Sequence, residues 1–121
     1  MSDWTKEELN ELSRAYEVRV AGRRQDGSAR PLVIVWHVVV DGVLYLRSVR
    51  GPEGKWYQGV TRYGEGFLNW GGQTREVTYT HDDSRDGAID VAYSAKYGNG
   101  SPTRAITNAL ATETTLRVDP R

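Results

Sequence analysis

The pattern of apolar and polar residues predicts that most of this chain forms β-strands. Residues 31–40, PLVIVWHVVV, are almost entirely apolar, and a second apolar run covers residues 43–46. Asp41-Gly42 separates the two runs, and this dipeptide is typical of a two-residue type I′ hairpin turn because glycine tolerates a positive φ angle. We therefore predict a β-hairpin whose first strand is covered on both faces, as in a barrel or a sheet beneath a helix.

The turn also fixes the predicted pairing of the two strands. Side chains alternate between the faces of a strand, so each pair of opposed residues shares one face. The expected pairs are Val40 with Val43, Val38 with Tyr45, Trp36 with Arg47, His37 with Leu46, and Val35 with Ser48. This places Trp36, Tyr45 and Arg47 on one face and His37, Ser48 and Arg50 on the other.

The remaining patterns predict further strands and a few helices. Thr5 and Glu8 form a capping-box pattern at the start of an N-terminal helix. Alternation predicts strands at residues 16–23, 74–80 and 112–118, and Gly71-Gly72 predicts a hairpin after residues 67–70. Helical spacing predicts a helix from Ser84 or Asp86 to residue 97, and Ser101-Pro102 predicts a second helix before the last strand. The fold class is therefore mainly β, of the α+β type.

Composition narrows the function classes. At 121 residues, the chain is expected to form one domain over residues 1–121. Sixteen basic and sixteen acidic residues cancel, which argues against nucleic-acid and anionic-membrane binding. Because there is no cysteine and no apolar run of membrane length, we expect a soluble, cytoplasmic protein. The chain has four Trp and seven Tyr, whose rings are apolar and carry one polar group each. Such residues are typical either of partly solvated pockets and interfaces or of the ends of a barrel.

Candidate ligand-binding residues follow the hairpin directly. The segment RSVRGPEGKWY, residues 47–57, combines glycines, a serine hydroxyl, basic side chains and an aromatic pair, a set that can hold an anion beside a flat ring. Lys96 ends the apolar stripe of the predicted helix that runs to residue 97, where it either covers the core edge or points toward a bound anion. His81-Asp82-Asp83 has no third ligand at a recognisable spacing, so no metal site is predicted.

Three segments carry a resemblance to a known family: WHVVVDGVLYLRSVRGPEGKWY, IDVAYSAKYG and TTLRVDPR. They resemble a bacterial family described as domain of unknown function 2255. That family is similar to small split β-barrels that bind flavin or deazaflavin, in which an acidic-Gly turn, Ser, Gly and Trp follow in the order seen here at Asp41-Gly42, Ser48, Gly51, Gly54 and Trp56. The resemblance implies a split β-barrel of six to seven antiparallel strands, with an N-terminal helix and two helices before the last strand, that is often a homodimer.

The resemblance also implies a function and a site. The first hypothesis is an oxidoreductase that uses FMN or deazaflavin and acts on a small organic substrate. In it, the cofactor-binding residues are Arg47, Ser48, Arg50, Gly51, Lys55, Trp56, Tyr57 and Lys96. The basic residues and Ser48 hold the phosphate, and Trp56 and Tyr57 wall the ring. Ser48, Arg50 and Lys55 are preferred because Arg47 is predicted to face the other way. No catalytic residue is assigned.

Two other function classes remain open at this point. One is a cofactor-free enzyme or small-molecule-binding protein with an aromatic pocket, in which His37 or a Tyr-carboxylate pair acts as acid or base. The other is a dimeric interaction protein whose aromatic residues form the subunit interface.

Overall fold

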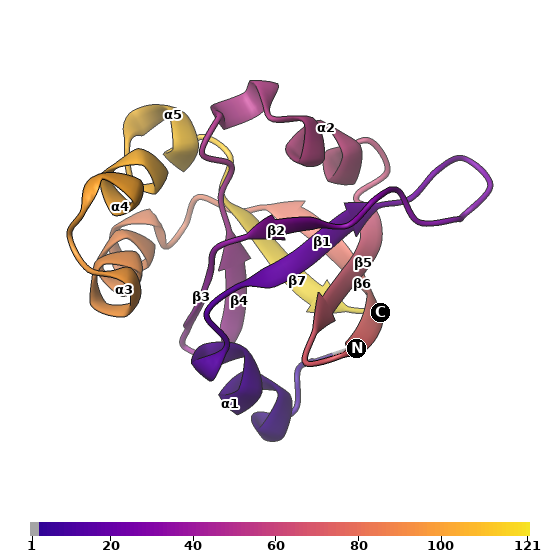
Figure 1. Cartoon of the computed structure of the whole chain (residues 1–121), viewed down its shortest axis with the longest axis horizontal. Helices are drawn as coiled ribbons and strands as arrows, with labels where there is room; N and C mark the ends of the chain where they lie inside the picture. Colours follow the sequence, from indigo (N-terminus) through magenta and orange to yellow (C-terminus); the bar gives the residue numbers. More distant parts are fainter. Residues whose placement is uncertain (1–2) are drawn as a thin grey trace.

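A computed structural model describes residues 3–121 of the chain. In these residues seven antiparallel strands form one sheet that curls into a nearly closed barrel, in the order β2-β1-β5-β6-β7-β4-β3 (Figure 1). The fold is therefore the small α+β barrel that the sequence predicts. The strands are β1 (Val18–Gly22), β2 (Val33–Val35), β3 (His37–Val40), β4 (Val43–Leu46), β5 (Glu65–Trp70), β6 (Gln73–His81) and β7 (Leu116–Pro120).

The hairpin of β3 and β4 confirms the predicted turn and most of the predicted pairing. Asp41 and Gly42 have φ angles of 50° and 78°, as a type I′ turn requires. The ladder runs from Val40 opposite Val43 to His37 opposite Leu46.

The pairing predicted beyond His37 is wrong. Val35 lies opposite Val18 of β1, and not opposite Ser48. The apolar run is split at Trp36 into two strands, and each strand bonds to a different neighbour. Since β2 and β3 are the two edges of the sheet, the barrel closes where the chain passes through Trp36.

Helices cover the ends and one side of the barrel. They are α1 (Lys6–Arg14), the short 3-10 helix η1 (Gly51–Glu53), α2 (Lys55–Thr61), α3 (Asp86–Tyr97), α4 (Ser101–Ile106) and α5 (Ala109–Thr112). Figure 1 shows α1 at one end of the barrel, α2 at the other, and α3, α4 and α5 grouped at its side. The segment expected to hold two helices before the last strand holds three, and α2 lies where a loop was expected.

The N-terminal helix begins at the predicted capping box. The Thr5 hydroxyl accepts a hydrogen bond from the Glu8 backbone at 3.1 Å, and the Glu8 carboxylate accepts one from the Thr5 backbone at 2.9 Å. The preceding Trp4 is buried, and its indole Nε1 donates to the Val118 carbonyl at 2.8 Å. This bond fastens the start of the chain to β7.

Two apolar clusters stabilise the fold. The larger fills the barrel with side chains from its strands and from α1, including Leu12, Leu44 and Leu68, all fully buried. The smaller lies between the β3–β4 hairpin and the helices α3 and α4, around Val38 and Tyr93. The hairpin is therefore covered on both faces, as its apolar sequence predicts.

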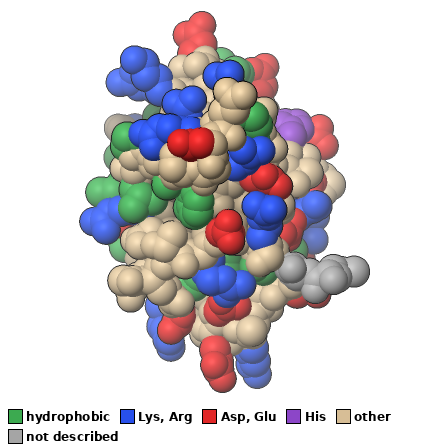
Figure 2. Space-filling view, turned by 90° about the vertical axis from the view of Figure 1, so that its right-hand side faces the viewer, with side chains coloured by type: hydrophobic (Ala, Val, Ile, Leu, Met, Phe, Trp, Pro, Cys, Tyr) green, Lys and Arg blue, Asp and Glu red, His purple; other side chains and the backbone are tan. Residues whose placement is uncertain are grey.

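The surface has no single sign of charge on the face that Figure 2 presents. Basic and acidic side chains are interspersed there, in keeping with the balanced composition. Within residues 3–121, no helix is both long enough and apolar enough to cross a membrane.

Candidate functional site

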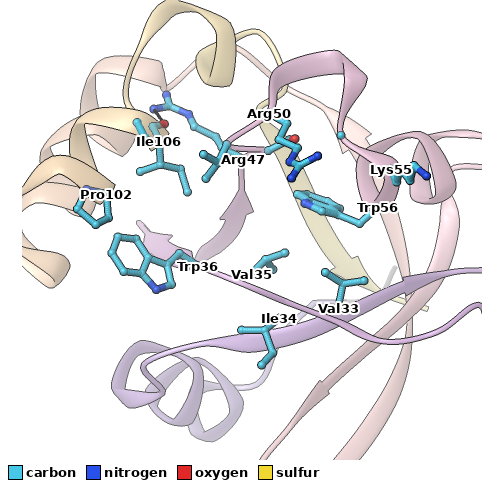
Figure 3. A pocket seen from close by; sticks show the side chains of 14 residues that line it. Val33, Ile34, Val35, Trp36, Arg47, Arg50, Lys55, Trp56, Pro102 and Ile106 are labelled. Carbon is cyan, nitrogen blue, oxygen red and sulfur yellow. Dashed lines mark hydrogen bonds between the residues drawn. The ribbon is translucent and has the colours of Figure 1, made fainter.

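A cavity of about 520 Å³ opens where the barrel edge, the segment after β4, and the helices α2 and α4 meet (Figure 3). This volume is in the range of sites that hold cofactors and other small molecules. Most of the lining is apolar. The lining residues are Val33, Ile34, Val35, Trp36, Arg47, Ser48, Val49, Arg50, Gly54, Lys55, Trp56, Pro102, Ala105 and Ile106.

Two tryptophans form opposite walls of this cavity. Trp36 stands on the side of α4, and Trp56 stands on the side of α2 (Figure 3). Trp36 is held in place by Tyr97, which stacks on it with ring centroids 3.9 Å apart and planes 5° from parallel. Trp56 is braced by the edge of Tyr57 at 6.2 Å. Two indoles in a mostly apolar lining offer aromatic surface to a flat, conjugated ligand.

Positive charge is concentrated at the Trp56 end. Arg50 and Lys55 are both exposed, and in Figure 3 both lie on the same side of the cavity as Trp56. Among the described residues, neither forms an ion pair or a side-chain hydrogen bond within the protein. Their donors are therefore available to an anionic group of a ligand.

Ser48 is one of the lining residues of the same cavity, and its hydroxyl is buried beside Gly54. Its backbone N–H donates to Thr114 Oγ1 at 2.8 Å, while its own Oγ has no hydrogen-bond partner among the described residues. A Cβ atom on Gly54 would lie 2.3 Å from this Oγ, so the glycine is what leaves room for the hydroxyl. Buried hydroxyls without a partner are uncommon in folded proteins, and one beside a cavity is a candidate donor for a ligand.

Arg47 contributes its stem to the cavity and directs its guanidinium into the protein. The side chain is fully buried, and it bonds to Asp86 at 3.2 Å, to Asp90, and to Thr115 Oγ1 at 3.0 Å. It also donates to the backbone carbonyls of Asp86 and Ile106. The guanidinium thus joins the end of β4 to α3, α4 and the segment before β7.

The cavity brings five of the eight predicted site residues together: Arg47, Ser48, Arg50, Lys55 and Trp56. The other three lie elsewhere. Gly51 has a φ angle of +69°, and a Cβ there would meet Leu110 at 2.4 Å. Tyr57 packs against the barrel core, and the amine of Lys96 is directed at His37.

The predicted separation of faces is wrong at this site. Ser48 and Arg50 were expected to share a face with His37, opposite Trp36. Instead Ser48, Arg50 and Trp36 line one cavity and His37 does not. The reason is that β4 ends at Leu46, so the alternation of side chains stops before Ser48.

Sequence reasoning missed the contributions of β2 and α4 to the lining. For β2 a sequence signal did exist: residues 33–35 are apolar on both faces of the strand. Only one face can pack against the barrel core, so the other face had to contact something else, which is the cavity. No sequence signal pointed to Pro102, Ala105 and Ile106, because only the folded chain brings α4 to this place.

His37 is the histidine that sequence reasoning offered as an acid or base. It is fully buried, and desolvation, together with the nearby charge of Lys96, lowers its pKa to about 4. It does not line the cavity. Within residues 3–121, no group of three or more His, Asp or Glu side chains is arranged to hold a metal ion.

The family comparison matches residues 8–118 to a bacterial family described as "Uncharacterized protein conserved in bacteria (DUF2255)". This range covers most of the chain, and the chain therefore belongs to that family. A search of curated proteins found no match.

Solved structures share the fold at low sequence identity. An F420 reductase is 15% identical with a TM-score of 0.56, over 93% of this chain and 90% of the other. An FAD-binding protein from Mesorhizobium loti is 14% identical with a TM-score of 0.52, over 97% and 88%. The heme storage protein HutZ from Vibrio cholerae is 6% identical with a TM-score of 0.64, over 96% and 88%. These likenesses establish a split-barrel fold shared with flavin-type proteins.

Proposed function

We propose that this DUF2255 member is a small oxidoreductase that binds a flavin or deazaflavin cofactor and acts on a small organic substrate. The observation that carries the proposal is the cavity itself, whose lining combines two indoles with basic side chains and a serine whose buried hydroxyl is unpaired. The fold shared with an F420 reductase and an FAD-binding protein supports the same assignment.

The residues present fit such a cofactor. Trp36 and Trp56 would wall the ring, and Ser48, Arg50 and Lys55 would hold the phosphate. Gly54 keeps the space beside Ser48 clear. When bound, the cofactor would supply hydride or electron transfer, and the apolar lining from β2 and α4 would exclude water from the ring.

The lining also favours a cofactor over acid–base chemistry by side chains alone. None of the described lining residues is His, Asp, Glu or Tyr, and the titratable ones are Arg47, Arg50 and Lys55. A cofactor-free enzyme that relied on His37 or on a Tyr-carboxylate pair would lack those groups in its pocket. The absence of these groups from the lining supports a bound cofactor as the source of reaction chemistry.

Titration with FMN and with F420 tests the proposal. The purified wild-type protein should bind one of them with a Kd in the micromolar range. Arg50→Ala should weaken binding about tenfold, because one charge-assisted hydrogen bond to phosphate is lost. Lys6→Ala removes an equal charge from α1, outside the cavity, and should leave Kd unchanged. Failure of both cofactors to bind would overturn the proposal.

We also propose that a second copy of the chain packs beside the cavity. Leu32, Val33, Ile34 and Val49 are between 40% and 52% exposed, and three of them line the cavity mouth. They lie on or beside the edge strand β2 and the segment after β4, where unpaired apolar surface favours association.

Light scattering after gel filtration tests this dimer. The wild type should have the mass of two chains, and Ile34→Glu should shift it toward one. Val91→Glu, on the outer face of α3 where the side chain is 69% exposed, is the matched control and should stay dimeric. A wild type that elutes with the mass of one chain would contradict the proposal.

A further inference from the structure

One wall of the cavity is formed by a single face of α4. Pro102, Ala105 and Ile106 stand at positions i, i+3 and i+4 of this helix, so their side chains lie on the same face. All three line the cavity, and none carries a polar side-chain group. We call these three residues the α4 wall. Figure 3 shows Pro102 and Ile106 on the side of Trp36, away from Lys55.

The one basic residue within Ser101–Ile106 is directed away from the cavity. Arg104 is exposed and is not among the lining residues. Its guanidinium donates to the Asn99 carbonyl and to the Ser101 hydroxyl, each at 3.0 Å. These bonds hold the positive charge beside the loop that joins α3 to α4, so the α4 wall gains no cation from its own helix.

Arg47 brings more negative than positive charge close to the α4 wall. Its guanidinium lies 3.4 Å from the Ile106 carbonyl oxygen and pairs with both Asp86 and Asp90. One cation between two carboxylates leaves an excess of one negative charge. A ligand anion against this wall would be repelled by that charge and would find no free cation there. A ligand cation would find no carboxylate among the described lining residues, so it would lose water without gaining a partner.

An uncharged ligand meets neither penalty. Trp36 adds aromatic surface beside the α4 wall, and the stacked ring of Tyr97 holds the indole in place. Burial of apolar ligand surface against such a lining is favourable. We propose that the α4 wall binds an uncharged, largely apolar aromatic molecule, and that this molecule is the substrate. The substrate role rests on the proposed function, whereas the binding itself does not.

The three isoleucines of the chain provide a test that needs no cofactor. Ile106 belongs to the α4 wall, Ile34 lines the cavity on β2, and Ile89 is fully buried outside the lining. We would label the isoleucine methyl groups with ¹³C and titrate the purified protein at pH 7, before any cofactor is added, following the signals by NMR.

The ligands are 1-naphthylmethanol, 1-naphthylmethylamine and 1-naphthoate, which share a ring system and are uncharged, cationic and anionic at this pH. The alcohol should shift the Ile106 signal in a saturable way and leave Ile89 in place. At Ile106 it should bind about tenfold more tightly than either charged compound, because a charge loses hydration there without a partner.

The variant Ala105→Glu tests whether the lack of charge in the α4 wall decides this preference. A carboxylate in the wall should weaken binding of the alcohol about tenfold and make the amine the tightest ligand. Val91→Glu places the same charge on the outer face of α3, outside the lining, and should keep the wild-type order. The wild-type ligand series decides the proposal even if Ala105→Glu fails to fold.

Failure of this proposal can be told apart from failure of the cofactor proposal. If the alcohol shifts Ile106 while neither FMN nor F420 binds, the α4 wall remains a ligand site, and its role as a substrate site falls with the cofactor. If either charged compound binds at Ile106 as tightly as the alcohol, or if the alcohol leaves the Ile106 signal in place, the proposal is overturned whether or not a cofactor binds.

Discussion

At the scale of the residue, Ser48 is the lining residue whose hydrogen bonding most directly tests the proposed ligand. A buried hydroxyl without a partner costs free energy, and folded proteins leave few such groups. The neighbouring residue is Gly54, and the side chain of any larger residue at position 54 would collide with this hydroxyl. Both features are explained if the hydroxyl donates to a ligand.

Replacement of Ser48 by alanine should therefore separate stability from binding. The free energy of unfolding should stay the same or rise by up to about 1 kcal/mol, because an unsatisfied polar group is removed. Binding of FMN or F420 should weaken about tenfold. Urea denaturation and a cofactor titration measure the two effects.

Thr103→Val is the matched control for Ser48→Ala. Thr103 is also buried with an unpaired hydroxyl, but it does not line the cavity. This variant should keep the wild-type Kd. If Ser48→Ala lowers stability by several kcal/mol, or if it binds the cofactor as the wild type does, the role given to the hydroxyl is wrong.

At the scale of the element, two nearby arginines have different tasks. Arg47 joins the end of β4 to α3 through Asp86 and Asp90, and Arg50 is exposed at the cavity mouth. Arg47→Ala should lower the free energy of unfolding by about 3 kcal/mol, since it breaks a buried ion-pair network and leaves a void. Arg50→Ala should change it by less than about 0.5 kcal/mol. Urea denaturation compares the two, and equal effects would contradict this division.

The elements were predictable where local chemistry decides them. Asp41-Gly42 fixed the β3–β4 hairpin, and Thr5 with Glu8 fixed the start of α1. The break at Trp36 was not predictable, because no glycine or proline marks it and the run stays apolar on both sides. The strand is divided by closure of the barrel, which is a tertiary effect. Helix α2 was missed for a related reason: Gly54 and Gly59 at its start and within it read as loop residues.

At the scale of the whole molecule, the cavity is assembled from segments far apart in the sequence. Ser48, Arg50, Lys55 and Trp56 come from one stretch that sequence reasoning identified as a ligand-binding loop. The opposite walls come from β2 and α4, which reach the site only because the sheet closes and α3 leads back along its side. The sequence therefore predicted some of the residue types that line the cavity, but it did not predict the shape of the cavity.

The four tryptophans provide the most direct measurement of the central claim. Trp36 and Trp56 line the cavity, whereas Trp4 and Trp70 are buried in the core with 7% and 4% exposure. We would titrate the ¹⁵N-labelled protein with FMN and with F420 and follow the four indole N–H signals by NMR. The account predicts that the Trp36 and Trp56 signals shift with a saturable dependence on cofactor while those of Trp4 and Trp70 stay in place. If none of the four signals responds, or if only the core pair does, the cavity is not a flavin or deazaflavin site.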